Sequence, residues 1–170
     1  MTIERFAPSP TGFLHLGHAY SALLAYNSAL ESGGKFLIRI EDIDRVRCKK
    51  KYVSQILDDL NWLGIKYEKP ILSQSTRFFE YKNVLKKLWK TNYLFACNCS
   101  RKEINIASAP NETQRFGPDG IIYPNTCINK LKLKNMPETA LRLNLNNLDK
   151  ENFSFFDKKY GEISFTKEDA

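Results

Sequence analysis

The segment from Ile3 to His18, IERFAPSPTGFLHLGH, predicts a β-strand that runs through a proline-rich loop into the start of an α-helix. Residues 3–7 lean apolar, and the turn formers of 8–12 end the strand. From Leu16 onward apolar side chains recur at helical spacing, and a pair of glycines follows at 33–34. We therefore expect a helix over 16–31.

A second strand is predicted at 36–40, FLIRI, and it ends in the charged segment 41–45. Strand, helix and strand in this order make a βαβ unit, in which the two strands are parallel. Open parallel sheets bind ligands beyond the carboxyl ends of their strands, so loop 8–12 and segment 41–45 would both lie at the binding edge. The sequence thus predicts an α/β fold.

The rest of the chain predicts three parts. Apolar stripes favour helices over 53–63 and 78–89, whereas periodicity is lost after Leu94. We expect a first domain at 1–96, an inserted loop-rich subdomain at 97–136, and return strands within 137–170. The strands of that last part are predicted at 140–145, 153–156 and 162–165. Its end carries no helix-stop or capping signal, so we expect the chain to be part of something longer.

Composition limits the class of protein more than its function. A chain of 170 residues and 19.7 kDa suits one well-buried domain with a small insertion. The net charge of +7 permits a polyanionic partner, but a lysine-rich solvated surface explains it equally well. No leader-like segment and no apolar stretch of about 20 residues is found, so we expect a cytoplasmic protein without membrane contact.

The two histidines of the sequence, His15 and His18, both fall where the first helix is expected to begin. A helix N-terminus attracts phosphate through its free N–H groups and its dipole, and residues three apart share a face. The two imidazoles would hydrogen-bond a polyphosphate, and Gly17 would let a flat ring such as adenine approach the backbone. The alternative is that each is an ordinary, partly buried histidine.

The block from Arg5 to Gly12, followed by His15-Leu16-Gly17-His18, resembles the signature of class I aminoacyl-tRNA synthetases of the glutamyl type. The segment 39–47, RIEDIDRVR, is similar to the second block of that family. The resemblance implies a Rossmann-like parallel sheet, here its first half, that binds ATP with Mg²⁺ and L-glutamate and acts on tRNA. Nothing after Phe165 is similar to the lysine-rich KMSKS-type loop of the second half.

The resemblance also implies roles for single residues. His15, Gly17 and His18 would be catalytic. Arg5 would pair with the side-chain carboxylate of glutamate, since a guanidinium matches a carboxylate with two hydrogen bonds, and Glu41 would face its ammonium group. The implied glutamate site is formed by Arg5, Phe6, Ala7, Pro8, Ser9 and Glu41. The alternatives are a surface charge for Arg5 and a helix cap for Glu41. Asp44 and Arg47 are expected to hold the loop by an ion pair.

Three of the four cysteines suggest a metal site in the inserted subdomain. Cys97 and Cys99 flank one residue, and Tyr123 and Cys127 follow after a long gap. Two neighbouring thiolates chelate zinc readily, and a subdomain with few apolar residues needs such a cross-link, although buried reduced thiols remain an alternative. A tyrosine oxygen is an unusual ligand. Cys48 matches no ligand position, and we treat it as structural.

The spacing Cys-x-Cys, then Tyr-x-x-x-Cys, is similar to that of a short branch of the family, the glutamyl-queuosine tRNA(Asp) synthetases. This resemblance implies one structural Zn²⁺ held by Cys97, Cys99, Tyr123 and Cys127. It also implies tRNA-independent activation of glutamate with ATP and transfer of the glutamyl group to queuosine in the anticodon of tRNA(Asp). We expect a monomer, and little or no adenylate from these 170 residues alone.

Three other functions stay open. A fragment of an ordinary glutamyl-tRNA synthetase would continue into a helical anticodon-binding domain. A nucleotidyltransferase with the same His-x-Gly-His device would act on pantetheine phosphate or a cytidylyl substrate, but the block at 5–12 and the cysteine spacing argue against it. A non-catalytic zinc protein would bind RNA without binding ATP or glutamate.

Overall fold

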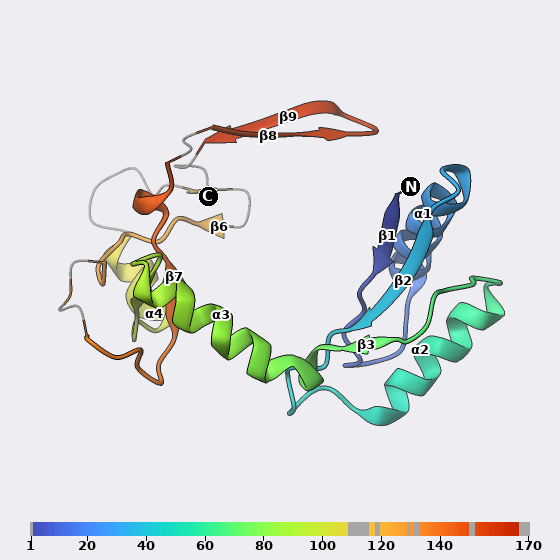
Figure 1. The fold of residues 1–170 in the computed structure, drawn as a ribbon, viewed down its shortest axis with the longest axis horizontal. Helices are drawn as coiled ribbons and strands as arrows, with labels where there is room; N and C mark the ends of the chain where they lie inside the picture. The colour runs from blue at the N-terminus through green and yellow to red at the C-terminus, as the bar shows by residue number, and fades with distance from the viewer. Residues whose placement is uncertain are drawn as a thin grey trace. The chain divides into compact units, whose positions relative to one another are not determined.

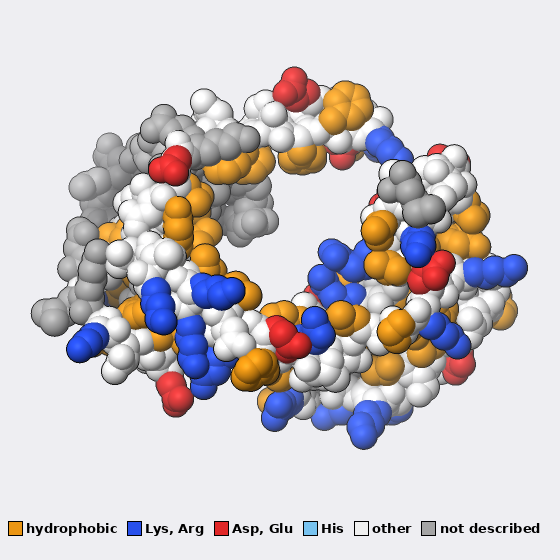
Figure 2. All heavy atoms as spheres, viewed as in Figure 1, with side chains coloured by type: hydrophobic (Ala, Val, Ile, Leu, Met, Phe, Trp, Pro, Cys, Tyr) orange, Lys and Arg blue, Asp and Glu red, His pale blue; other side chains and the backbone are white. Residues whose placement is uncertain are grey.

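The computed structural model describes residues 2–108, 116–117, 120–128, 130, 133–149 and 152–166. The chain forms two compact units, Met1–Tyr81 and Lys82–Ala170. Every helix within the described residues is too short or too polar to span a bilayer. Figure 2 shows Lys and Arg side chains scattered over the drawn face among acidic and apolar ones, so charge alone marks no single binding patch on that face.

The first unit contains the predicted βαβ arrangement. Strand β1 (Ile3–Phe6) pairs in parallel with β2 (Lys35–Ile40), and the register runs from Ile3 opposite Lys35 to Phe6 opposite Ile38. Helix α1 (Leu16–Glu31) connects them and packs against both strands (Figure 1). Strand β3 (Leu72–Ser73) adds a third parallel strand beside β2. The predicted α/β class with a parallel sheet is confirmed, whereas β3 was not predicted because two residues show no alternation.

The core of this unit follows the two periodicities of the sequence. Alternate residues of β2 are buried, and so are two residues of α2 (Lys50–Trp62) that lie one helical turn apart. Helix α1 contributes small side chains, which let its backbone approach the sheet closely. The buried set consists of Phe6, Ala22, Ala29, Phe36, Ile38, Ile40, Ile56, Leu60 and Ile65.

The glycine pair after α1 ends the helix as predicted, and the structure explains why glycine is required at both positions. Gly33 adopts φ +59°, the left-handed conformation that favours glycine at a helix end. A Cβ on Gly34 would lie 2.3 Å from the carbonyl oxygen of Thr2, so only glycine lets β2 begin beside the start of β1. The Lys35 N–H donates to that same Thr2 oxygen at 2.9 Å.

The chain leaves β3 through the 3-10 helix η1 (Gln74–Arg77) and α3 (Phe78–Lys90), which spans the boundary between the units. In the second unit, β4 (Leu94–Ala96) pairs antiparallel with β7 (Leu141–Leu143). Two further antiparallel pairs are β5 (Phe116–Gly117) with β6 (Gly120–Ile121), and β8 (Asn152–Asp157) with β9 (Gly161–Thr166). Phe153 and Phe165 stack across the last pair with ring centroids 5.3 Å apart.

The second unit is less irregular than expected. Helix α4 (Arg101–Ala107) follows the cysteine pair, and the 3-10 helix η2 (Leu145–Asn147) follows β7. The predicted strands near 140–145, 153–156 and 162–165 are confirmed, whereas α4 was missed. Its sequence signal was present, because Ser100 and Glu103 form a capping box.

The division at 1–96, 97–136 and 137–170 stays a prediction. Residues 82–96, which it assigns to the first domain, lie within the second compact unit. Within the predicted insertion, positions 109–115, 118–119, 129 and 131–132 lie outside the described residues.

Candidate active site and metal centre

A cleft opens in the first unit where the loop after β1 meets the start of α1. Its volume is about 520 Å³, within the range of small-molecule sites. It lies at the carboxyl end of β1, the edge where the sequence predicted ligand binding. The residues that line it are Arg5, Phe6, Ala7, Pro8, Ser9, Thr11, Gly12, Phe13, Leu14, His15, His18 and Ser21.

The proline-rich loop is fixed by its carbonyl groups. The Glu41 N–H donates to the Pro8 oxygen, and the Lys49 N–H donates to the Pro10 oxygen, each at 3.0 Å. Both prolines are buried. Proline has no N–H, so the loop contributes acceptors here and the segment after β2 supplies the donors. The loop and the charged segment therefore lie side by side, as the order of elements predicted.

The two histidines cap helix α1 reciprocally. His15 is the N-cap, and its Nδ1 accepts from the Gly17 N–H at 3.1 Å. The Nδ1 of His18 accepts from the His15 N–H at 3.2 Å, and the two ring centroids are 3.8 Å apart. Because each Nδ1 is an acceptor, a neutral ring carries its proton on Nε2. Both rings line the cleft, where these Nε2–H groups are suitable donors to an anion.

Burial, and then the neighbouring His15 ring, lower the pKa of His18 below its ordinary value of 6.5. His18 is therefore mainly neutral at pH 7. A neutral imidazole can hydrogen-bond a phosphate oxygen without giving up the tautomer that caps the helix.

Gly17 has a steric role that the sequence did not reveal. A Cβ at this position would lie 3.1 Å from Cε1 and 3.2 Å from Nδ1 of His15, closer than most real contacts. Glycine thus leaves room for the His15 ring to fold over the helix start. Its predicted role, close approach of adenine to the backbone, stays a prediction.

All residues of the predicted glutamate site except Glu41 line the cleft, and so do the predicted catalytic residues except Gly17. Arg5, which is exposed, borders the cleft from β1. Glu41 is half-buried and forms an ion pair with Arg39, whose Nε and Nη2 both donate to Oε1 of Glu41. Arg39 was missed, although its position two residues before Glu41 puts both on one side of the strand end. The substrate roles of Arg5 and Glu41 stay predictions.

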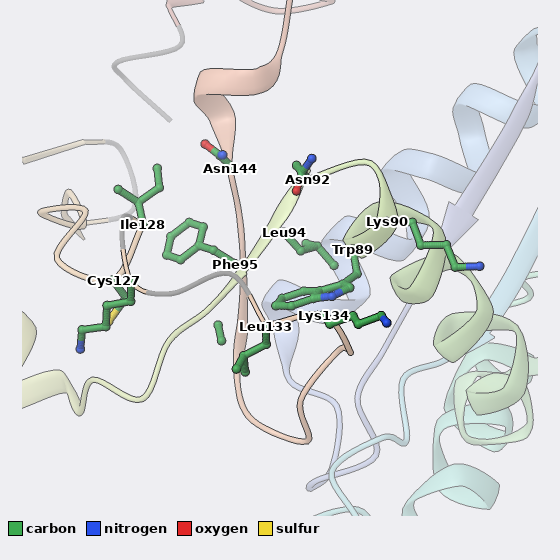
Figure 3. Close-up of a pocket in the computed structure, with 12 residues that line it drawn as sticks. Trp89, Lys90, Asn92, Leu94, Phe95, Cys127, Ile128, Leu133, Lys134 and Asn144 are labelled. Atoms are coloured by element: carbon green, nitrogen blue, oxygen red, sulfur yellow. The ribbon is translucent and has the colours of Figure 1, made fainter.

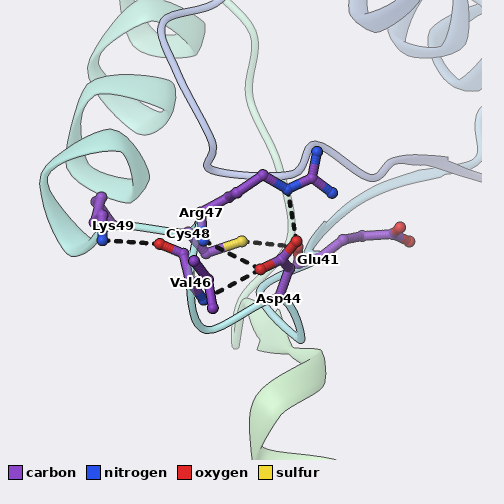
Figure 4. Close-up of polar contacts among 6 residues, drawn as sticks. All are labelled: Glu41, Asp44, Val46, Arg47, Cys48 and Lys49. Atoms are coloured by element: carbon purple, nitrogen blue, oxygen red, sulfur yellow. Dashed lines mark hydrogen bonds and ion pairs between the residues drawn. The ribbon is translucent and has the colours of Figure 1, made fainter.

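The segment after β2 is stabilised by its own side chains (Figure 4). Asp44 Oδ1 accepts from the backbone N–H groups of Val46 and Arg47 at 3.1 Å, and Arg47 Nε donates to Oδ2 at 2.6 Å. The predicted Asp44–Arg47 ion pair is confirmed. The hydrogen bond from the Arg47 side chain is the main cause that lowers the pKa of Asp44.

Cys48 lies in the same segment, and its hydrogen bonds agree with the structural role expected for it. Its thiol donates to the Glu41 carbonyl at 3.7 Å, and its N–H donates to the Asp44 carbonyl at 2.9 Å. Burial, followed by the nearby aspartates, raises the pKa of this thiol, so it stays protonated and unreactive.

In the second unit the predicted cysteines come together. The Sγ atoms of Cys97, Cys99 and Cys127 all lie within 4.8 Å of one another, and those of Cys99 and Cys127 are 3.4 Å apart. The Tyr123 hydroxyl oxygen lies 3.3 Å from the Cys97 sulfur and 3.8 Å from the Cys99 sulfur. Cys97 and Cys127 are buried.

This cluster has the dimensions of a zinc site. Two sulfurs bound at about 2.3 Å to a tetrahedral ion are separated by roughly 3.8 Å, and a sulfur and an oxygen by roughly 3.5 Å. The observed separations are close to these values. The three cysteines are therefore compatible with a bound zinc ion, and the Tyr123 oxygen lies near the remaining corner.

The cluster also favours thiolates, the form that binds metal. A hydrogen bond from Tyr123 is the main cause that lowers the pKa of Cys127 to about 6. At Cys97 burial opposes ionisation, but hydrogen bonds from Tyr123 and Arg142 prevail and lower its pKa. Burial and the neighbouring cysteines raise the pKa of Tyr123, so its hydroxyl stays protonated in the metal-free protein.

A second cavity of about 290 Å³ lies beside the cluster, and no motif of the sequence predicted it. Aromatic and aliphatic side chains line it together with lysines, among them Lys90 and Lys134 (Figure 3). Cys127 forms part of its wall. The cavity is lined by Trp89, Lys90, Asn92, Leu94, Phe95, Ala96, Cys127, Ile128, Lys130, Leu133, Lys134 and Asn144.

The parallel βαβ unit with its histidine-capped helix has the α/β fold of a class I aminoacyl-tRNA synthetase catalytic domain, and the second unit adds the three-cysteine cluster. The chain belongs to the family of class I tRNA synthetases for glutamate and glutamine, whose catalytic-domain model matches residues 2–170.

The sequence of this chain is also similar to those of individual members of the family. The chain is 52% identical over 147 residues to the glutamyl-Q tRNA(Asp) synthetase of Rhodobacter capsulatus, covering 84% of this chain and 53% of that protein. It is 35% identical over 163 residues to the glutamyl-Q tRNA(Asp) synthetase of Rhodopirellula baltica, covering 94% and 50%. It is 37% identical over 162 residues to glutamate–tRNA ligase 2 of Ehrlichia chaffeensis, covering 95% and 34%. The chain thus spans about half the length of these two glutamyl-Q tRNA(Asp) synthetases and about a third of the Ehrlichia ligase.

Among solved structures, the chain is similar to a glutamate tRNA ligase from Elizabethkingia meningosepticum in complex with its amino acid. The TM-score is 0.70 at 27% identity, and the match covers 97% of this chain and 36% of that one.

Proposed function

We propose that this chain binds ATP and glutamate in a protein that forms glutamyl-adenylate without tRNA and then glutamylates queuosine in the anticodon of tRNA(Asp). The proposal depends on one observation: the imidazoles of His15 and His18, which cap the start of α1, line the same cleft as Arg5. The choice of queuosine is supported by the 52% identity to a glutamyl-Q tRNA(Asp) synthetase.

The first step is a displacement at phosphorus. An α-carboxylate oxygen of glutamate bonds to the α-phosphorus of ATP, while the bond from that phosphorus to the oxygen bridging to the β-phosphate breaks, and pyrophosphate leaves. His15 and His18 donate from Nε2 to phosphate oxygens and stabilise the charge that develops there, with no proton transfer required. Mg²⁺ accompanies the nucleotide and neutralises phosphate charge.

Recognition of glutamate requires one positive and one negative group. Arg5 pairs with the side-chain carboxylate, because its guanidinium offers two parallel N–H donors. Glu41 receives the ammonium group. Arg39 bonds Glu41 through Oε1, so the ion pair orients the carboxylate, and Oε2 is the oxygen proposed to receive the ammonium.

The cysteine cluster is proposed to hold one structural Zn²⁺ through Cys97, Cys99, Cys127 and the oxygen of Tyr123. Bound there, the ion cross-links the chain after β4 to the turn that contains Cys127. Tyr123 also accepts from the Cys127 N–H at 3.1 Å, which keeps its oxygen beside the sulfurs.

The test is glutamate-dependent ATP–pyrophosphate exchange by the full gene product, with and without tRNA. We expect exchange without tRNA, and none with aspartate or glutamine as controls. Exchange that strictly requires tRNA would overturn tRNA-independent activation. RNA binding with no exchange under any condition would favour a non-catalytic protein.

An ordinary glutamyl-tRNA synthetase is the second candidate, favoured by the 37% identity over 95% of this chain to an Ehrlichia ligase. The attachment point distinguishes the two. Glutamate on queuosine survives removal of the 3′-terminal adenosine of the tRNA, whereas glutamate on the 3′ end is lost with it.

A further inference from the structure

We propose that Arg142 is a positioning residue of the cysteine cluster, which holds Cys97 and Tyr123 in the arrangement that binds the metal. The proposal rests on the zinc site proposed above. It concerns a residue 45 positions away from Cys97 in the chain, outside every motif quoted for that site.

One side chain makes two contacts at the cluster. The Nε–H of Arg142 donates to the Cys97 sulfur at 3.2 Å, while the Cζ of the guanidinium lies 4.0 Å from the centroid of the Tyr123 ring. The first contact positions the Cys97 sulfur, and the second positions the Tyr123 ring, whose oxygen is the proposed fourth ligand. A planar guanidinium can do both at once, because its edge donates while its face stacks.

The backbone explains why Arg142 is held at this position. Arg142 lies in β7 directly opposite Phe95 of β4, one residue before the Ala96–Cys97 step. The Cys97 N–H continues this pairing by donating to the Ala140 carbonyl at 2.9 Å. Phe95 also stacks on Tyr123, with ring centroids 6.1 Å apart. The β4–β7 pair thus presents two cross-strand partners to the same tyrosine.

The charge of the site gives Arg142 a second role. Zn²⁺ with three thiolates and a neutral phenol carries a net charge of −1, and two of the three cysteines are buried. Burying an uncompensated charge is unfavourable, and a hydrogen-bonded cation beside it offsets that cost. Hydrogen bonds to metal-bound ligands also orient them, and their loss commonly weakens metal binding by about 10- to 100-fold.

The experiment is zinc competition against a chromogenic chelator, together with the thiolate-to-metal charge-transfer absorption of the Co²⁺-substituted protein. Arg142→Gln removes the charge and the stacking face, and Arg142→Lys keeps only the charge. The matched control is Arg101→Gln, which removes a positive charge from an exposed arginine two residues after Cys99.

We expect Arg142→Gln to weaken zinc binding about 10-fold and to shift the Co²⁺ absorption. Arg142→Lys should fall between wild type and Arg142→Gln, and Arg101→Gln should match wild type. If Arg142→Gln binds zinc as tightly as wild type with an unchanged spectrum, the proposal is wrong.

Two other outcomes are also decisive. An equal loss in Arg101→Gln would overturn a specific role, because general charge would then explain the effect. Failure of the wild type itself to bind zinc or cobalt would overturn the metal site, which separates that failure from a failure of Arg142. If Arg142→Gln lowers the melting temperature of the metal-free protein, Arg142→Lys supplies the same comparison in a better-folded background.

Discussion

The histidine cleft and the cysteine cluster are built in opposite ways. The hydrogen bonds that fix His15 and His18 join residues two and three positions apart, all within one helix start. In the cysteine cluster the side-chain contacts of Cys97 and Cys99 join residues 24 to 45 positions apart, and only the bond from the Cys127 N–H to Tyr123 is local among the contacts described above. The histidine cap is therefore specified by local sequence, whereas the cysteine cluster forms only when distant segments meet. A metal ion can supply much of the stabilisation that this requires.

The largest effect is expected when a proposed metal ligand is replaced, because this should destabilise the cysteine cluster and leave the histidine cleft unchanged. Cys97→Ser and Cys127→Ser should each lose zinc and destabilise the second unit, since structural zinc binding is worth about 10 to 16 kcal/mol in small metal-dependent folds. Metal analysis measures the loss of zinc, and amide hydrogen exchange measures the destabilisation. Cys48→Ser is the control and should keep its zinc.

The comparison would fail if the first unit unfolded together with the second in these variants. Protection of the core amides of β1 and β2 should stay unchanged. Stoichiometric zinc in both variants would remove the metal assignment altogether.

The next largest effect concerns the cleft. His15→Ala and His18→Ala, each in the full gene product, should lower exchange activity by about 10²- to 10³-fold, the typical loss when one donor to a developing charge is removed. Zinc content should not change in either variant. Activity within a few-fold of wild type for the double variant would refute the proposed role of the imidazoles.

The metal-free protein should respond to pH through Cys127. Its folded pKa of about 6 lies below the ordinary value of 9.0, so between these values the unfolded chain binds more protons than the folded one. The contribution of Cys127 to the free energy of unfolding should therefore increase from pH 6 to pH 9. This contribution should disappear as the pH falls through 6. Denaturant titrations of protein kept under a chelator and a reductant measure this. In Cys127→Ser the slope with pH should become shallower, and an unchanged slope would contradict the assignment.

The smallest effect is expected at Gly17. Gly17→Ala should stabilise the start of α1 by up to about 1 kcal/mol through backbone entropy, while crowding the His15 ring. In Gly17→Ala the melting temperature should therefore equal or exceed that of wild type, whereas the affinity for ATP should be lower. Ser21→Ala, further along the same helix, is a control for a general effect on the cleft wall. Unchanged ATP affinity in Gly17→Ala would show that the ring tolerates the methyl group.

Sequence patterns predicted the parts of the fold that depend on local order. The bounds of α1 followed from apolar spacing and the glycine pair, and β2 followed from a run of β-formers. Strand β3 is too short to carry a pattern, and α4 was overlooked because proline and glycine residues around it suggested loops. Its capping box was a stronger signal than the composition of its surroundings.

The candidate sites show the same limit. Residue type and spacing were sufficient to indicate the paired histidines and the three cysteines, whereas the other predicted cleft residues came from the family resemblance. They were not sufficient for Arg39 or Arg142, because a pairing partner is set by strand register and side-chain direction rather than by a motif. Asp42 is a similar case, since its carboxylate accepts from the N–H and the hydroxyl of Ser75, 33 residues away.

The bonded carbonyls of Pro8 and Pro10 have a consequence for the thermodynamics of ligand binding. A loop whose backbone torsions are limited by proline rings and anchored at both oxygens has already lost its conformational freedom during folding. Such a preorganised wall loses little further entropy when a ligand arrives, so more of the contact energy appears as affinity.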